Sequence, residues 1–218
     1  MKSEIYQNGC KYGRKKIKVT KSFRTRFNEN YVATIIPADN KRGYKVEYVY
    51  YAPWYIWKIS EEIFQKQKRI LLGMEIGSLI LFLAIVLLRI SLNSNKIVYG
   101  ITALNLCVQI LEIAALIDFM IARRKTTKIQ YENINRGLIA FTTIRSVLSS
   151  FAALICILLI ANKNMLSVKS MGMVLGLLIC SYLAWEIKRT YQQIPFITEE
   201  NDTLKKIYGA ESKSSKVQ

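Results

Sequence analysis

Four long apolar runs constrain this chain more than any other feature. They cover residues 70–88, 97–122, 137–161 and 171–187, and each approaches the roughly 20 residues that a helix needs to cross a bilayer. The net charge of +17 lies mostly outside these runs, although 51% of the 218 residues are hydrophobic. Such segregation is typical of an integral membrane protein with charged flanks. We therefore predict an all-α membrane protein, a four-transmembrane-helix bundle.

Lys and Arg are distributed unevenly between the two sides of the predicted spans. Before span one, between spans two and three and after span four lie thirteen: Lys58, Lys66, Lys68, Arg69, Arg123, Arg124, Lys125, Lys128, Arg136, Lys188, Arg189, Lys205 and Lys206. The two other connections hold four: Arg89, Lys96, Lys163 and Lys169. Because basic flanks stay in the cytoplasm, this alternation predicts a multi-pass plasma-membrane protein with both termini cytoplasmic. Frequent Lys, Ile and Asn residues are consistent with an AT-rich bacterial genome.

The regions outside the spans differ in character. Residues 1–57 contain "KIKVTKSF", "YVATII" and "YKVEYVYY", which predict a small β-rich cytoplasmic region with two to four antiparallel strands. Residues 58–69 are expected to form a juxtamembrane helix that continues into span one, and residues 188–218 a cytoplasmic tail that is disordered towards its end. The aromatic stretch at residues 48–57 suits the membrane interface or a core better than a ligand groove.

The N-terminal region also carries a dense basic segment, which has three interpretations. Its first residues are Lys11, Arg14, Lys15, Lys16 and Lys18. The favoured interpretation is contact with anionic lipid headgroups of the inner leaflet, and the next is a solvated strand face. Nucleic acid is an unlikely partner, because no binding module or aromatic-stacking pattern accompanies the charge.

Polar residues interrupt the second apolar run at helical spacing. Thr102, Asn105, Gln109 and Glu112 are separated by three, four and three residues, which places them on one face of a helix. A carboxylate facing lipid at mid-bilayer costs at least about 2.5 kcal/mol. This face is therefore expected to point towards other helices, a second subunit or a wet cavity.

Span three carries a matching face with Thr142, Arg145 and Ser149. The helical rise places Glu112 about 15 Å and Arg145 about 12 Å from the cytoplasmic ends of their spans. Glu112 is therefore the expected ion-pair partner of Arg145, and Asp118, about 6 Å deep, is the second candidate. Glu75 in span one has no evident basic partner, so it either carries a proton or competes for Arg145.

Two interpretations of these intramembrane polar residues remain open. In the first they form a network that fixes helix assembly, and in the second they line a path for an ion, a proton or a small polar substrate. We favour the first slightly, since one Arg among several acids balances well as an internal network. Small residues at a spacing of four, Gly73 with Gly77 and Gly172 with Gly176, are expected to contribute to helix packing.

The sequence contains no recognisable catalytic constellation. Histidine is absent, no CxxC pair occurs, and no nucleophile elbow, phosphate-binding loop or zinc-protease motif is present. We therefore predict a protein that is not an enzyme and has no cofactor and no metal site. The leading hypothesis is an accessory, regulatory or immunity-type subunit that acts through a protein partner or as a homo-oligomer. The alternative is a small oligomeric transporter or channel subunit that uses the polar face of span two with Arg145.

Overall fold

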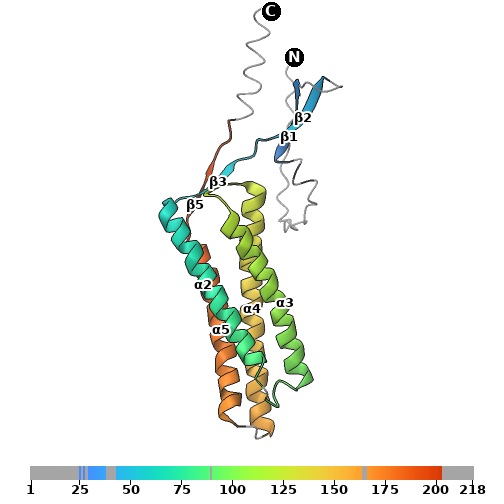
Figure 1. The fold of residues 1–218 in the computed structure, drawn as a ribbon, viewed down its shortest axis with the longest axis vertical. Helices are drawn as coiled ribbons and strands as arrows, with labels where there is room; N and C mark the ends of the chain where they lie inside the picture. Colours follow the sequence, from blue (N-terminus) through green and yellow to red (C-terminus); the bar gives the residue numbers. More distant parts are fainter. Residues whose placement is uncertain are drawn as a thin grey trace, which may run out of the picture.

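The structure is a computed structural model that describes residues 25, 27, 29–37, 43–88, 90–163 and 166–202. Most of this part of the chain is helical (Figure 1). The helices are α2 (Glu61–Val86), α3 (Lys96–Ile121), α4 (Lys128–Lys163) and α5 (Val168–Gln192). The basic segment that was predicted to contact lipid and the tail after residue 202 lie outside the described residues.

Three of the four helices, α2, α4 and α5, are longer than the apolar runs that predicted them, and α3 has the length of its run. The expected juxtamembrane helix forms the first turns of α2, which begins where the Ser60 side chain accepts a hydrogen bond from the Ile63 amide at 3.3 Å. α4 begins at Lys128, well before the apolar run at 137, and α5 continues to Gln192. Polar turns can extend a helix beyond its apolar run, because water satisfies their side chains while the backbone bonds continue.

The helices pack in the ring order α2, α5, α4, α3, and the fourth side of the ring is the weakest. α4 packs closely on both α3 and α5, and α2 packs on α5, whereas α2 and α3 make few contacts with each other. The four helices run side by side as one elongated bundle (Figure 1). The seam between α2 and α3 therefore needs stabilisation from something other than close helix packing.

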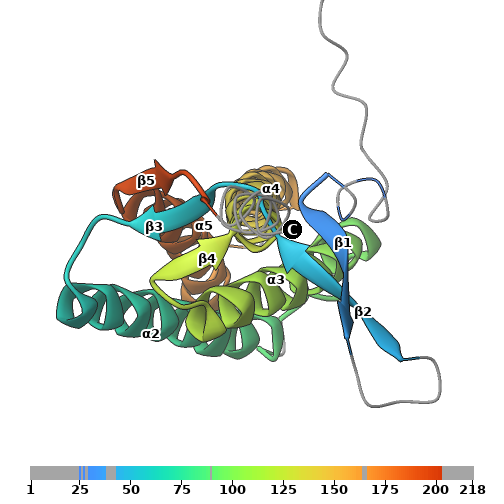
Figure 2. The same cartoon turned by 90° about the horizontal axis from the view of Figure 1, so that it is seen from above.

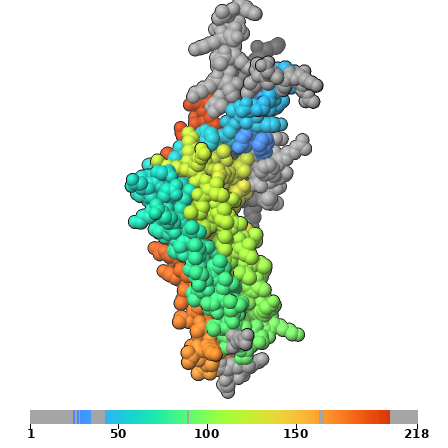
Figure 3. Space-filling view, in the orientation of Figure 1, coloured from blue at the N-terminus to red at the C-terminus, as the bar shows by residue number. Residues whose placement is uncertain are grey.

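Five strands gather at one end of the bundle (Figures 1 and 3). β1 (Tyr31–Pro37) and β2 (Tyr44–Tyr50) form an antiparallel hairpin in which Tyr31 pairs with Tyr50. β3 (Trp54–Trp57) lies between β4 (Lys125–Thr127) and β5 (Phe196–Glu199) in a second antiparallel sheet. This second sheet covers the ends of the helices, as the view along the bundle shows (Figure 2).

These strands differ in part from the predicted N-terminal sheet. β1 and β2 match two of its expected strands, but β3 pairs with the α3–α4 connection and with the segment after α5. The stretch "KIKVTKSF" lies outside the described residues. β5 also shows that the first part of the region predicted as a tail is ordered against β3.

The bundle core has three layers along the helix axis. Nearest the sheets lies an aromatic cluster that includes Trp57, Phe64 and Phe119. At the far end lies an aliphatic cluster around Phe82 and Leu177. Between the two clusters the buried side chains are polar, and they form the candidate site described below.

The outer surface of the bundle is apolar, the reverse of what a water-soluble bundle shows. Ile80, Ile110, Val147 and Leu175 are 57–63% exposed. All four helices are long and apolar enough to cross a membrane, with a mean hydropathy between 1.6 and 2.3 over their most apolar stretches. The described residues thus contain four candidate membrane spans, and the charged groups at mid-bundle lie inside.

A buried charge cluster as the candidate functional site

The polar stripe of the second predicted span faces the bundle interior. Thr102, Asn105, Gln109 and Glu112 on α3 are between 1% and 4% exposed. The facing stripe on α4 is equally buried, because Thr142, Arg145 and Ser149 are at most 2% exposed. The two stripes touch directly where the Asn105 amide donates to the Ser149 hydroxyl at 2.9 Å.

Arg145 is the centre of an ion-pair cluster that joins three helices. Its Nη1 donates to Oε1 of Glu75 at 3.0 Å, and its Nη2 lies 3.0 Å from Oε2 of the same carboxylate. Its Nε lies 2.9 Å from Oε2 of Glu112. The guanidinium of α4 therefore binds one carboxylate of α2 with two nitrogens and one carboxylate of α3 with the third. We call Glu75, Glu112 and Arg145 the charge cluster.

The charge cluster contains two acids and one base, and few polar groups surround it. From α3, the Gln109 amide donates to Glu75 Oε1 at 3.3 Å. From α5, the Cys180 side chain interacts electrostatically with the cluster, and its thiol donates to the Ser78 carbonyl oxygen at 3.8 Å. Oε1 of Glu112 is buried and has no hydrogen-bond partner. The cluster is therefore sealed from solvent and contains one more carboxyl group than basic groups.

Polar contacts bridge the loosely packed seam between α2 and α3. Besides the charge cluster, Lys68 of α2 reaches the end of α3, where its ammonium donates to the carbonyl oxygens of Met120 at 2.9 Å and Ala122 at 2.6 Å. Lys68 is only 3% exposed, and its ammonium lies 4.4 Å from the centre of the Phe64 ring. It thus caps the helix end with a positive charge, where the helix dipole favours one.

A serine cluster joins α4 to α5. The Ser181 hydroxyl donates to the Ser146 carbonyl oxygen at 2.8 Å and lies 2.7 Å from the Ser150 hydroxyl. This serine cluster was not predicted from the sequence, and Lys68 was expected only as a flanking charge. Both features depend on which way each helix is turned, which the spacing within one helix does not reveal.

One residue of the predicted site, Asp118, lies apart from the charge cluster. Asp118 is exposed on α3 and borders a cavity beside Phe27 and Tyr31, so it is not a partner of Arg145. Glu75 pairs with Arg145 alongside Glu112, which matches one of its two predicted alternatives, competition for Arg145.

The four glycines that were expected to pack helices behave differently from one another. Gly73, Gly77 and Gly172 are exposed, and a Cβ atom added to any of them would meet nothing within 4 Å. Gly176 faces α2, where an added Cβ would overlap the Ile85 side chain. Gly137 was not predicted, yet a Cβ there would lie 2.9 Å from that of Ala115. Close helix approach within the chain therefore requires glycine at 176 and 137 only, among the described glycines.

The hairpin is attached to the bundle through Tyr50. Its hydroxyl donates to the Pro53 carbonyl oxygen at 2.6 Å and accepts from the Lys128 amide at 2.9 Å. Burial raises the pKa of this hydroxyl above its ordinary value. The Asn201 amide donates to the Tyr50 carbonyl oxygen at 2.9 Å, so the segment after β5 contacts the same point.

Within the described part of the chain, no group of three or more His, Cys, Asp or Glu side chains could hold a metal ion. Comparison with models of protein families, with curated proteins and with solved structures finds no match for this chain. What the charge cluster does must therefore be argued from its geometry.

Proposed function

We propose that this chain is a multi-pass plasma-membrane protein with cytoplasmic N- and C-termini that acts as a non-enzymatic accessory, regulatory or immunity-type subunit. The support for membrane placement is the apolar outer surface of four helices of sufficient length. The support for orientation is the distribution of thirteen basic residues against four between the two ends. The strands then lie on the cytoplasmic side.

The observation that carries this proposal is the closure of the charge cluster. Arg145 is 2% exposed, and all three of its side-chain nitrogens lie within 3.0 Å of a carboxylate. Its carboxylate partners come from two other helices, so Arg145 joins three helices from the inside of the bundle. The Arg145 guanidinium therefore has no side-chain nitrogen left to bind a substrate.

The hairpin is the surface that best suits a protein partner. On β2, Tyr44, Val46 and Tyr48 point to one side, and they are 46%, 45% and 57% exposed. The hairpin lies beyond the helix ends, away from the apolar outer surface of the bundle (Figure 1). Lipid therefore does not cover this face of β2, whereas the surface of a protein partner can cover it.

Affinity purification of the full chain in a mild detergent tests this function. We expect the protein to recover a stoichiometric partner, and the triple variant Tyr44→Ser/Val46→Thr/Tyr48→Ser to lose it. The matched control is Lys45→Gln/Glu47→Gln, on the other side of the same strand. Recovery of the wild-type protein alone, without a partner, would contradict a partner-dependent function.

A second candidate is a small oligomeric transporter or channel subunit that uses the polar face of α3 with Arg145. The observation that favours it is the charge imbalance, because two carboxylates share one guanidinium. In a dry core the surplus charge would be balanced by a bound proton or cation. This candidate predicts flux into liposomes that Glu112→Gln abolishes while the variant still folds.

A further inference from the structure

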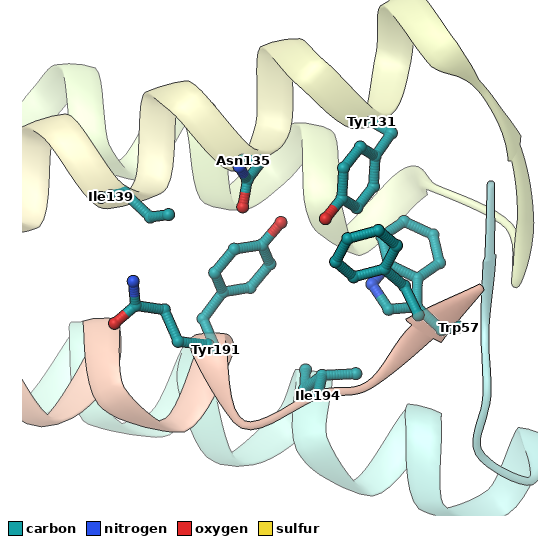
Figure 4. A pocket seen from close by; sticks show the side chains of 8 residues that line it. Trp57, Tyr131, Asn135, Ile139, Tyr191 and Ile194 are labelled. Atoms are coloured by element: carbon teal, nitrogen blue, oxygen red, sulfur yellow. The ribbon is translucent and has the colours of Figure 1, made fainter. Parts of the chain in front are cut away.

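A cavity of about 270 Å³ opens where the helices meet the second sheet. Its walls come from β3, from α4 and from the consecutive elements α5 and β5, three segments that are far apart in the sequence (Figure 4). Trp57 and Tyr131 form its aromatic side, and Asn135 and Gln192 contribute amides. None of the eight lining side chains is an acid or a base that is charged at neutral pH, so the lining suits an uncharged group.

The hydroxyl of Tyr191 marks this cavity as a binding site. Its ring extends from α5 towards Asn135 of α4 (Figure 4). Tyr191 is 4% exposed, and its hydroxyl has no hydrogen-bond partner. Buried hydroxyl groups in proteins are nearly always paired. A ligand in the cavity that carries a hydrogen-bond acceptor would supply the missing partner.

The position of the cavity indicates the kind of ligand. Tyr131 lies in the first turn of α4 and Tyr191 in the last turn of α5, at the end of the bundle that carries the sheets. In the membrane placement proposed above, this is the level where acyl chains meet headgroups, and aromatic rings favour that level. Ile139 lies two turns further along α4, so the lining extends towards the bundle centre with an aliphatic side chain.

We propose that this cavity binds the glycerol-ester region of one phospholipid from the cytoplasmic leaflet. The ester carbonyl oxygens accept hydrogen bonds from the Tyr191 hydroxyl and from the amides of Asn135 and Gln192. One acyl chain follows Ile139 towards the bilayer centre. The inference rests on the proposed membrane placement but not on the proposed protein partner.

Native mass spectrometry of the full-length protein, reconstituted with dioleoylphosphatidylglycerol and released into detergent, tests the assignment. We expect one tightly held phospholipid per chain in the wild type. Retention should fall about fivefold to tenfold in Tyr191→Phe, because one hydrogen bond is lost. Tyr191→Phe keeps the aromatic ring and its packing against Phe119, whose ring centroid lies 5.4 Å away. Gln192→Leu is a second test, at a position that is exposed. The matched control is Tyr182→Phe, on the exposed side of α5.

Three outcomes would overturn the proposal. Equal retention by all variants would mean that the lipid is bound elsewhere. Triacetin carries the same ester carbonyls without long chains, and it can be titrated against the emission of Trp57 in a Trp54→Phe/Trp185→Phe background. Saturable triacetin binding without phospholipid retention would assign the cavity to a soluble ester. Release of the protein from membranes by alkaline carbonate would refute the membrane placement itself, whereas equal retention in a membrane-bound protein refutes only the cavity assignment.

Discussion

Replacing Arg145 with Met should destabilise the bundle more than any other single change in the charge cluster. The substitution removes all three nitrogens that contact Glu75 and Glu112, while the two buried carboxylates remain. Leaving a buried ion pair without one partner costs about 3–5 kcal/mol. For a chain of this size, about 2–4 °C of melting temperature corresponds to each kcal/mol, so we expect a fall of roughly 6–20 °C.

Thermal unfolding of purified protein in detergent, followed by the fraction that remains monodisperse, measures this fall. Glu75→Gln/Glu112→Gln/Arg145→Met should recover most of the loss, because it removes the surplus charge together with its partner. The matched control is Arg189→Met, whose side chain is 54% exposed and pairs with Glu186 at 3.6 Å; we expect little change there. If Arg145→Met melts within the error of the wild type, the cluster does not hold the helices together.

Three further changes test separate parts of the structure. Lys68→Met should lower the melting temperature, because it leaves the Met120 and Ala122 carbonyl oxygens without their donor. The control Lys66→Met, at an exposed position, should not. Equal melting temperatures of the two variants would contradict the role of Lys68 at the end of α3. Gly176→Leu should destabilise through overlap with Ile85 by about 1–3 kcal/mol, and Gly172→Leu, with open space around it, should be tolerated in the same assay. Tyr50 should ionise above its ordinary pKa of about 10, since burial favours the neutral hydroxyl; its contribution to stability is then present below pH 10 and lost as the pH rises through the raised pKa. The tyrosinate absorbance of the wild type minus that of Tyr50→Phe measures this, and ionisation below pH 10 would contradict it.

The four helices could be predicted because long apolar runs and helical spacing are local properties of the sequence. The same spacing indicated that Glu112 and Arg145 face each other, since α3 and α4 are joined by a short connection and must run antiparallel. The role of Glu75 could not be predicted in this way. It depends on how α2 is rotated about its own axis, and α2 packs against α5 rather than against its neighbour in the sequence.

The features that sequence analysis missed all depend on contacts between distant segments. β3 pairs with β4, which follows α3, and with β5, which follows α5. The sequence of residues 54–57 does not predict which strands pair with it. Gly73 and Gly77 form a small-residue ridge that turns out to face outward. In the sequence Lys68 does not differ from the other flanking basic residues, and only its contact with the end of α3 distinguishes it.

Flux measured with the wild-type protein in sealed liposomes tests most directly whether the buried charges serve structure or transport. We expect protein reconstituted in folded form to move protons and monovalent cations no faster than empty liposomes do. We also expect Glu112→Gln to change the melting temperature but not this background rate. Flux above the background that Glu112→Gln abolishes, in a variant that still folds and inserts, would contradict the structural role and establish a pathway along the polar face of α3.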